Sequence, residues 1–232
     1  MTSGNLRWHV SGRHWAIRAD ARAQRCFAQA LLLLKMSIMG RLRSAFGGAA
    51  GQDAEEHDVR GFRVIVENSR ADISTPDVLT RLDDALALIE RHQPWRFAHM
   101  RRDLSSFWIV RYPCRGAYFP DRRACMTELT FLARTDITAA PVASSILHEG
   151  MHARVHAMGV SPVDRDMAHE ERICRRAELA FGFSLPAELG RPVIERAEAS
   201  LQLSDGEVAP AIDWSEARRR QDAVDSAARH RP

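Results

Sequence analysis

The stretch LHEGMHARVH, residues 147–156, places three histidines four residues apart, with a glutamate directly after the first. Residues i and i+4 lie on one face of an α-helix, so His148 and His152 can direct their imidazoles at a single ion. Glu149 lies one residue further round the helix, within reach of a water molecule on that ion. The HExxH pattern therefore predicts a metal site, with zinc as the expected metal.

His156, the third histidine, is not expected to bind the same ion. It follows His148 by eight residues, which places it about 12 Å further along a straight helix. Zinc ligands lie only about 2 Å from the metal, so three histidines spread over that length cannot share one ion. The remaining ligand must come from another part of the chain.

The next predicted helix offers the missing ligand. The helix that carries the motif is expected over residues 138–158, ended by Gly159, and a second helix is expected over about 164–183. A carboxylate from the second helix would complete a site of two histidines and one glutamate that leaves a position open for water. The side chains that this helix provides are His169, Glu170, Glu171 and Glu178.

The spacing of these residues resembles the gluzincins, in which HExxH is followed after eighteen to twenty residues by a glutamate on an antiparallel helix. Residues 153–170 separate His152 from Glu171, a gap of eighteen, and the resemblance covers about residues 124–183. It implies His148, His152 and Glu171 as ligands of Zn²⁺ and Glu149 as the general base. Glu170 and then His169 rank behind Glu171 as third ligand, and Glu178 is a candidate for orienting a ligand.

The family resemblance also implies a function and a partner. A metal-activated water, with Glu149 accepting its proton, would hydrolyse an amide bond in a peptide or protein substrate. The edge strand of the cleft would be residues 127–133, which would pair with an extended peptide; the alternative for this segment is an ordinary core strand. Gluzincins often carry an acid four residues after the ligand glutamate, whereas this chain has Arg175 there. Candidate donors to the developing oxyanion are His169, Arg175, Tyr118 and Tyr112.

Two other functions compete with the hydrolase. Zinc would be structural or regulatory in a binding protein if four protein ligands closed the site. Alternatively, the HExxH match is incidental on a metal-free helical scaffold.

The rest of the chain predicts an α+β fold, a small and mostly antiparallel sheet packed on helices. The β-branched run at 61–69 predicts a strand, and residues 75–92 show apolar positions at helical spacing. Further elements are expected as a short helix after Pro94, strands at 106–112 and 124–133 joined by a turn-rich connection at 113–121, and a helix from Pro186 to about 201.

Charge and composition separate a basic leader and flexible linker (1–60) and a charged tail (204–232) from the domain at 61–203, which the resemblance implies is zincin-like. Residues 1–50 hold eight of the 33 Lys and Arg residues but one of the 30 acids, so the remainder is mildly acidic. Nucleic-acid binding is therefore not expected.

The apolar stretch 27–39 is too short for a stable membrane insertion and is interrupted by Lys35. A cytoplasmic location is expected, with export as the alternative if residues 1–50 are a signal peptide. The four cysteines form no CxxC pair and predict reduced, structural thiols.

Overall fold

The computed structural model describes residues 54–159, 166–209 and 213–229. All of them belong to the second of the two units into which the chain divides, Gln52–Pro232. The leader expected over 1–60 falls almost wholly outside the described residues, as does the apolar stretch 27–39. Among the helices that are described, none combines the length and hydropathy of a membrane span.

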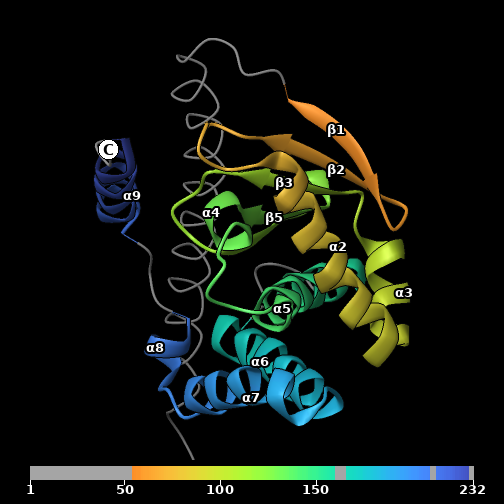
Figure 1. The fold of residues 1–232 in the computed structure, drawn as a ribbon. Helices are drawn as coiled ribbons and strands as arrows, with labels where there is room; N and C mark the ends of the chain where they lie inside the picture. Colours follow the sequence, from red (N-terminus) through yellow and green to blue (C-terminus); the bar gives the residue numbers. More distant parts are fainter. Residues whose placement is uncertain (1–53, 160–165, 210–212, 230–232) are drawn as a thin grey trace, which may run out of the picture. The chain divides into compact units, whose positions relative to one another are not determined.

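A five-stranded mixed sheet, in the order β1-β2-β3-β5-β4, forms one layer of the fold (Figure 1). The two outer pairings, β1 with β2 and β4 with β5, are antiparallel, and the two inner pairings are parallel. The expected α+β class is confirmed. The strands are β1 Glu55–Val59, β2 Phe62–Glu67, β3 Ser106–Val110, β4 Gly116–Phe119 and β5 Ala124–Glu128.

The parallel pairing of β2 with β3 follows from the helices between them. Parallel neighbours need a crossover connection, here supplied by α2 (Thr75–His92) and α3 (Pro94–Asp103). Helix α2 begins after Ser74, whose side chain accepts a hydrogen bond from the Asp77 N–H. Strand β2 alternates, with Phe62, Val64 and Val66 buried beneath these helices.

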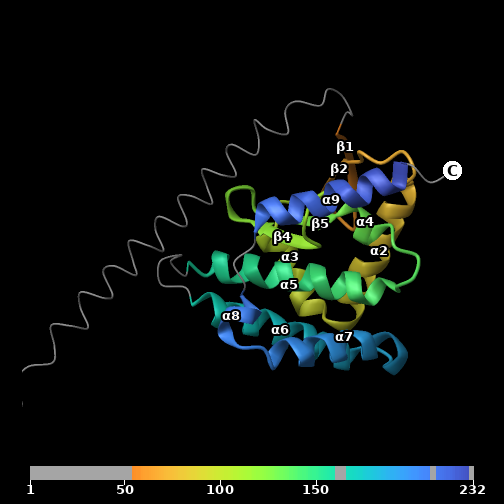
Figure 2. The ribbon, with the colours of Figure 1, turned by 90° about the vertical axis from the view of Figure 1, so that its left-hand side faces the viewer.

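Helix α5 (Ala139–Ala157) carries the HExxH motif and lies between the sheet and the helical half of the fold, α6 (Met167–Ser184) and α7 (Ala187–Leu201) (Figure 1). Figure 2 shows α5 and α6 running side by side. Twelve residues of α5 are buried, because a helix in this middle layer packs on more than one side. The short elements are η1 Pro120–Arg122, α4 Leu129–Leu132 and α8 Asp205–Val208.

Two strands lie where the sequence predicted none. Strand β1 falls within the expected linker and pairs with β2 through a turn in which Arg60 and Gly61 have φ of 50° and 72°, values typical of a two-residue hairpin. Its charged sequence EEHDV suits an exposed edge and gives no apolar signal. Strand β4 falls within the connection expected at 113–121.

The prediction of a strand over residues 124–133 was correct for its first half only. Residues 124–128 form β5, which lies between β3 and β4 with every residue buried, and residues 129–132 turn into helix α4. The Glu128 side chain accepts a hydrogen bond from the Phe131 N–H and so starts that helix. The edge strand beside α5 is therefore β4, and the prediction of 127–133 as the edge is wrong.

The expected charged tail includes a helix, α9 (Trp214–Arg229), that is tied to the sheet by ion pairs. Asp225 accepts hydrogen bonds from Arg70 at 2.8 Å and from Arg111 at 2.9 Å. Arg111 also contacts Glu128 at 2.6 Å. These side chains are largely shielded from water, so the network is worth more than an exposed pair.

Candidate metal centre

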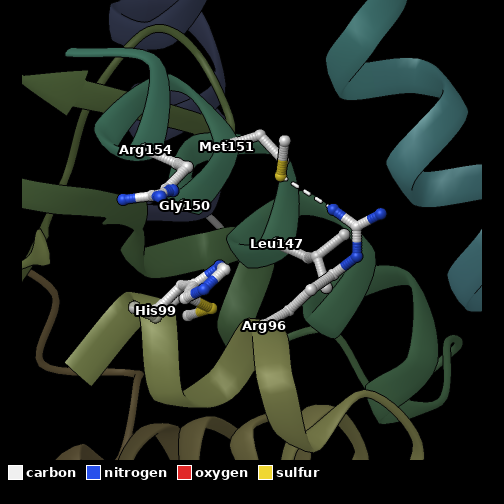
Figure 3. Close-up of a pocket in the computed structure, with 7 residues that line it drawn as sticks. Arg96, His99, Leu147, Gly150, Met151 and Arg154 are labelled. Atoms are coloured by element: carbon white, nitrogen blue, oxygen red, sulfur yellow. Dashed lines mark hydrogen bonds between the residues drawn. The ribbon is translucent and has the colours of Figure 1, made fainter. Parts of the chain in front are cut away.

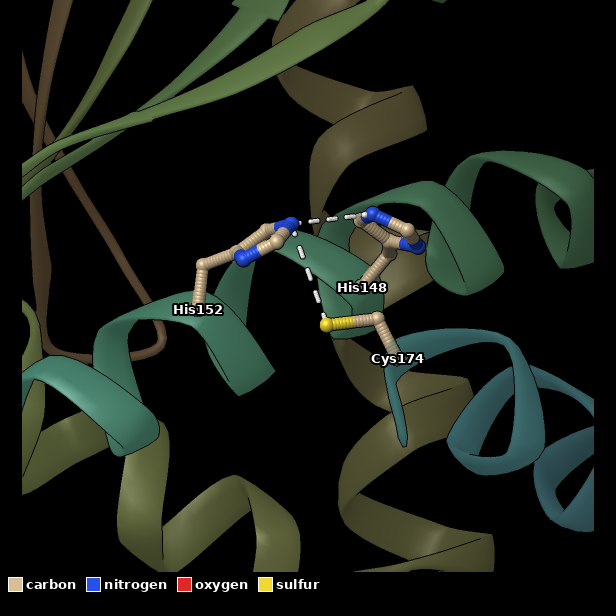
Figure 4. Close-up of side chains that lie close together, drawn as sticks. All are labelled: His148, His152 and Cys174. Carbon is tan, nitrogen blue, oxygen red and sulfur yellow. Dashed lines mark hydrogen bonds between the residues drawn. The ribbon is translucent and has the colours of Figure 1, made fainter. Parts of the chain in front are cut away.

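His148 and His152 extend from adjacent turns of α5 toward one another, and their Nε2 atoms lie 3.1 Å apart (Figure 4). Helix spacing alone places both rings on one face. His148 is 6% exposed and His152 is partly buried, so the pair is largely shielded from solvent.

The outer ring nitrogens are held by carboxylates from α6. Nδ1 of His148 lies 2.7 Å from Oε1 of Glu178, and Nδ1 of His152 lies 2.7 Å from Oε1 of Glu170. An ionised carboxylate only accepts hydrogen bonds, so each Nδ1 carries its proton and donates it. This tautomer leaves the two Nε2 atoms as the available ligand atoms, and a carboxylate on the outer nitrogen makes a histidine a stronger ligand.

The carboxylate of Glu171 lies opposite both Nε2 atoms. Its Oε2 is 3.3 Å from His148 Nε2 and its Oε1 is 3.3 Å from His152 Nε2. Two ligand atoms of a tetrahedral zinc ion, each about 2.1 Å from the metal, lie about 3.4 Å apart. The spacings of 3.1 and 3.3 Å between these three side chains match that value, so the residues present fit a zinc ion.

Cys174 joins the same cluster and was not predicted from the sequence. Its sulfur lies 3.8 Å from His152 Nε2, and the ligand atoms of His148, His152 and Cys174 all lie within 4.8 Å of one another (Figure 4). From the sequence, Cys174 was expected to be a reduced, structural thiol. The available signal was its spacing of three residues from Glu171, which puts both on one face of the helix.

The carboxylates around the two histidines favour positive charge at the cluster, as the pKa shifts of His148 and Glu171 indicate. Burial by itself lowers the pKa of His148, but hydrogen bonds with Glu171 and Glu178 outweigh burial and raise that pKa from 6.5 to about 10. Burial likewise acts to raise the pKa of Glu171, but the two imidazoles overcome it and hold that pKa well below 4.5. Without a metal, the site retains protons in the place where a cation would be bound.

Glu149 points from α5 toward the edge strand. It is 9% exposed, and a Cβ atom at Gly116 of β4 would lie 3.1 Å from its Oε1. Glycine at position 116 therefore lets the strand approach the carboxylate closely. The carboxylate of Glu149 thus lies against β4, next in sequence to the candidate ligand His148.

Of the other residues that the sequence analysis considered for the site, most contact other parts of the protein. His156 contacts the ring of Tyr118, with ring centroids 5.8 Å apart, and His169 is exposed at the start of α6. Tyr112 packs against Trp214 of α9. Of the proposed oxyanion donors, Arg175 contacts the cluster directly, with Nη1 2.6 Å from Glu178 and Nη2 4.0 Å from Glu171.

A small pocket occupies a different face of α5 (Figure 3). Arg96 crosses it from α3 and donates to the sulfur of Met151 at 2.8 Å. His99 also lines it, and burial lowers the pKa of that imidazole. No carboxylate is found among its lining residues in the described part of the chain, so it does not compete with the histidine cluster as a metal centre.

No family model, curated protein or solved structure matches this chain in the comparisons.

Proposed function

We propose that this protein is a zinc-dependent hydrolase, most simply a metallopeptidase, with His148, His152 and Glu171 as ligands and Glu149 as general base. The observation that carries the proposal is the convergence of both Nε2 atoms on the Glu171 carboxylate, while Glu170 and Glu178 hold the outer nitrogens. The similarity of the eighteen-residue spacing to the gluzincins supports the same assignment.

The roles of the side chains follow from their positions. When bound, zinc supplies a water of lowered pKa and polarises the carbonyl that it contacts. Glu149 accepts a proton from the attacking water and passes it to the leaving amine. Arg175, whose Nη2 lies 4.0 Å from Glu171, is the candidate donor to the developing oxyanion.

A peptide substrate is supported by the position of β4. This strand is the last in the sheet order, so in the described structure one of its edges is not paired with another strand. An extended peptide added to that edge by β-augmentation would pair with the strand that lies against Glu149.

The substitution Glu149→Gln tests the mechanism, because it removes the base and keeps the size of the side chain. We expect hydrolysis to fall by about 10²- to 10⁴-fold while the zinc content stays at that of the wild type. Peptide cleavage is measured by mass spectrometry on a mixed peptide library, and zinc by elemental analysis. Glu195→Gln, on the exposed face of α7, is the matched control. Full activity in Glu149→Gln would exclude this mechanism.

A second candidate function is favoured by Cys174. Structural zinc sites are closed by four protein ligands, whereas catalytic sites keep one position open. A sulfur within 3.8 Å of His152 Nε2 is in reach of that fourth position, so zinc could serve a structural or regulatory role in a binding protein. Zinc analysis of His148→Ala against wild type tests both metal-dependent functions, since equal zinc in the two would favour a metal-free scaffold.

A further inference from the structure

Cys174 differs from an ordinary core residue in what its side chain contacts. It is fully buried, yet its sulfur lies 3.8 Å from Nε2 of His152. Figure 4 shows the sulfur reaching from α6 toward the two rings of α5. The thiol is thus part of the polar cluster.

The distance between sulfur and nitrogen fits a shared metal ion. In a tetrahedral zinc site, a sulfur about 2.3 Å and a nitrogen about 2.05 Å from the metal lie about 3.5 Å apart. The observed separation of Cys174 Sγ from His152 Nε2 is 3.8 Å, a few tenths of an ångström above that value. The ligand atoms of His148, His152 and Cys174 all lie within 4.8 Å of one another, so a shift of the sulfur toward His148 by about an ångström or less, within reach of a side-chain rotation, would complete the geometry.

The charge of the resulting ligand set also fits. Two neutral imidazoles, the Glu171 carboxylate and a thiolate carry a total charge of −2, which balances a divalent cation. Uncompensated charge is costly in a buried site, and a neutral metal-ligand unit avoids that cost.

We propose that Cys174 is a fourth protein ligand, which closes the resting metal centre formed with His148, His152 and Glu171. On metal binding the S–H bond breaks, its proton passes to solvent, and the sulfur electron pair forms the bond to the metal. The ligand assignment rests on the metal site of the proposed function, and only its regulatory consequence rests on the catalytic step.

A closed centre has a regulatory consequence. With all four side chains bound to a metal ion, no position would be open to water or a substrate carbonyl, and the wild type would be held in a resting state. Removing the sulfur opens the fourth position. We therefore expect Cys174→Ser to hydrolyse peptides several-fold faster than the wild type while keeping one metal ion per chain.

The spectroscopic test uses the full-length protein loaded with Zn²⁺ or Co²⁺. We expect X-ray absorption of the zinc form to show one sulfur at about 2.3 Å, and the cobalt form to show a sulfur-to-metal charge-transfer band in the near ultraviolet. Both signals should disappear in Cys174→Ser and persist in Cys114→Ser, a matched control that removes a different described thiol. If X-ray absorption of the wild type shows only nitrogen and oxygen atoms bound to zinc, that result alone overturns the inference. Signals that survive in Cys174→Ser would overturn it as well.

The two proposals fail in distinguishable ways. If sulfur ligation is observed but neither wild type nor Cys174→Ser shows hydrolysis that depends on Glu149, Cys174 is a ligand and the hydrolase proposal fails. If hydrolysis depends on Glu149 but the zinc has no sulfur neighbour, the hydrolase stands and the closed centre fails.

Discussion

Three glutamates of α6 contact the two histidines of α5 in three different ways. Glu170 and Glu178 each contact one outer nitrogen, and Glu171 contacts both inner nitrogens. The lower-numbered glutamate pairs with the higher-numbered histidine, which is the pattern of antiparallel helices. One helix thus supplies a candidate ligand and both of the groups that orient the histidines.

At the residue scale, the orienting role of Glu178 is testable by Glu178→Gln. The amide keeps a hydrogen bond to His148 Nδ1 but loses the negative charge that strengthens the ligand, so we expect zinc affinity to fall by about 10-fold. Competition with a fluorescent chelator measures the affinity.

Glu198→Gln, at an exposed position of α7, removes the same charge away from the site and is the control. Equal zinc affinity in both variants would show that the carboxylate of Glu178 does not tune the metal ligand.

At the element scale, the close approach of α6 and α7 depends on two glycines. A Cβ atom at Gly190 would collide with the carbonyl oxygen of Gly182, and a Cβ at Gly182 would lie 2.8 Å from Cγ1 of Ile194. The helices meet through backbone, which a side chain of any size would separate. Because α6 carries the glutamates, this contact also positions the candidate metal centre.

The substitution Gly190→Ala is expected to destabilise the protein by about 1–3 kcal/mol or more, because backbone atoms cannot rotate out of the way as a side chain can. Gly206→Ala is the matched control, since a Cβ there meets no atom within 4 Å. We expect Gly206→Ala to change the stability by less than about 1 kcal/mol. Urea unfolding of both variants measures the difference, and equal midpoints would contradict the prediction.

The identity of the edge strand is a second feature at this scale. The apolar run at 124–133 has the stronger strand signal, yet a strand with every residue buried has neighbours on both sides. The four-residue strand β4 occupies the edge with a glycine and a tyrosine in its sequence GAYF. Local propensity identifies strong strands, whereas strand order depends on pairing between distant segments.

At the scale of the whole molecule, the buried charges make stability depend on pH in the metal-free protein. His148 has a pKa raised to about 10, so its contribution is complete below its unfolded pKa of 6.5 and is lost as the pH rises toward 10. Burial acts to raise the pKa of Glu178, but His148 and Arg175 lower it. Its contribution is therefore present above 4.5 and lost as the pH falls.

We therefore expect the cluster to stabilise the chelator-treated protein most between about pH 4.5 and 6.5, and progressively less toward about pH 10. Urea unfolding of the wild type and of His148→Gln at several pH values across this range measures the contribution of His148 to the free energy of unfolding. The free-energy difference between the two should shrink as the pH rises. A constant difference would show that the imidazole is not held protonated by its neighbours.

The sequence by itself determined the features that depend on short spacing. Helix α2 has the bounds expected, Thr75–His92, and α3, α5, α6 and α7 lie within a few residues of their predicted ranges, because apolar periodicity and capping residues act within a few turns. The convergence of His148 and His152 is likewise local, since one helix turn separates them.

Only the tertiary structure decided which distant side chains meet that pair. The sequence ranked Glu171 first but could not distinguish its approach to both Nε2 atoms from the contact of Glu170 with Nδ1. Their separation on one helix is a single residue, and the rotation of α6 against α5 decides between them. The same packing brings Cys174, twenty-two residues from His152, to the candidate metal site. Such contacts depend on the angle and distance between helices, which no local pattern specifies.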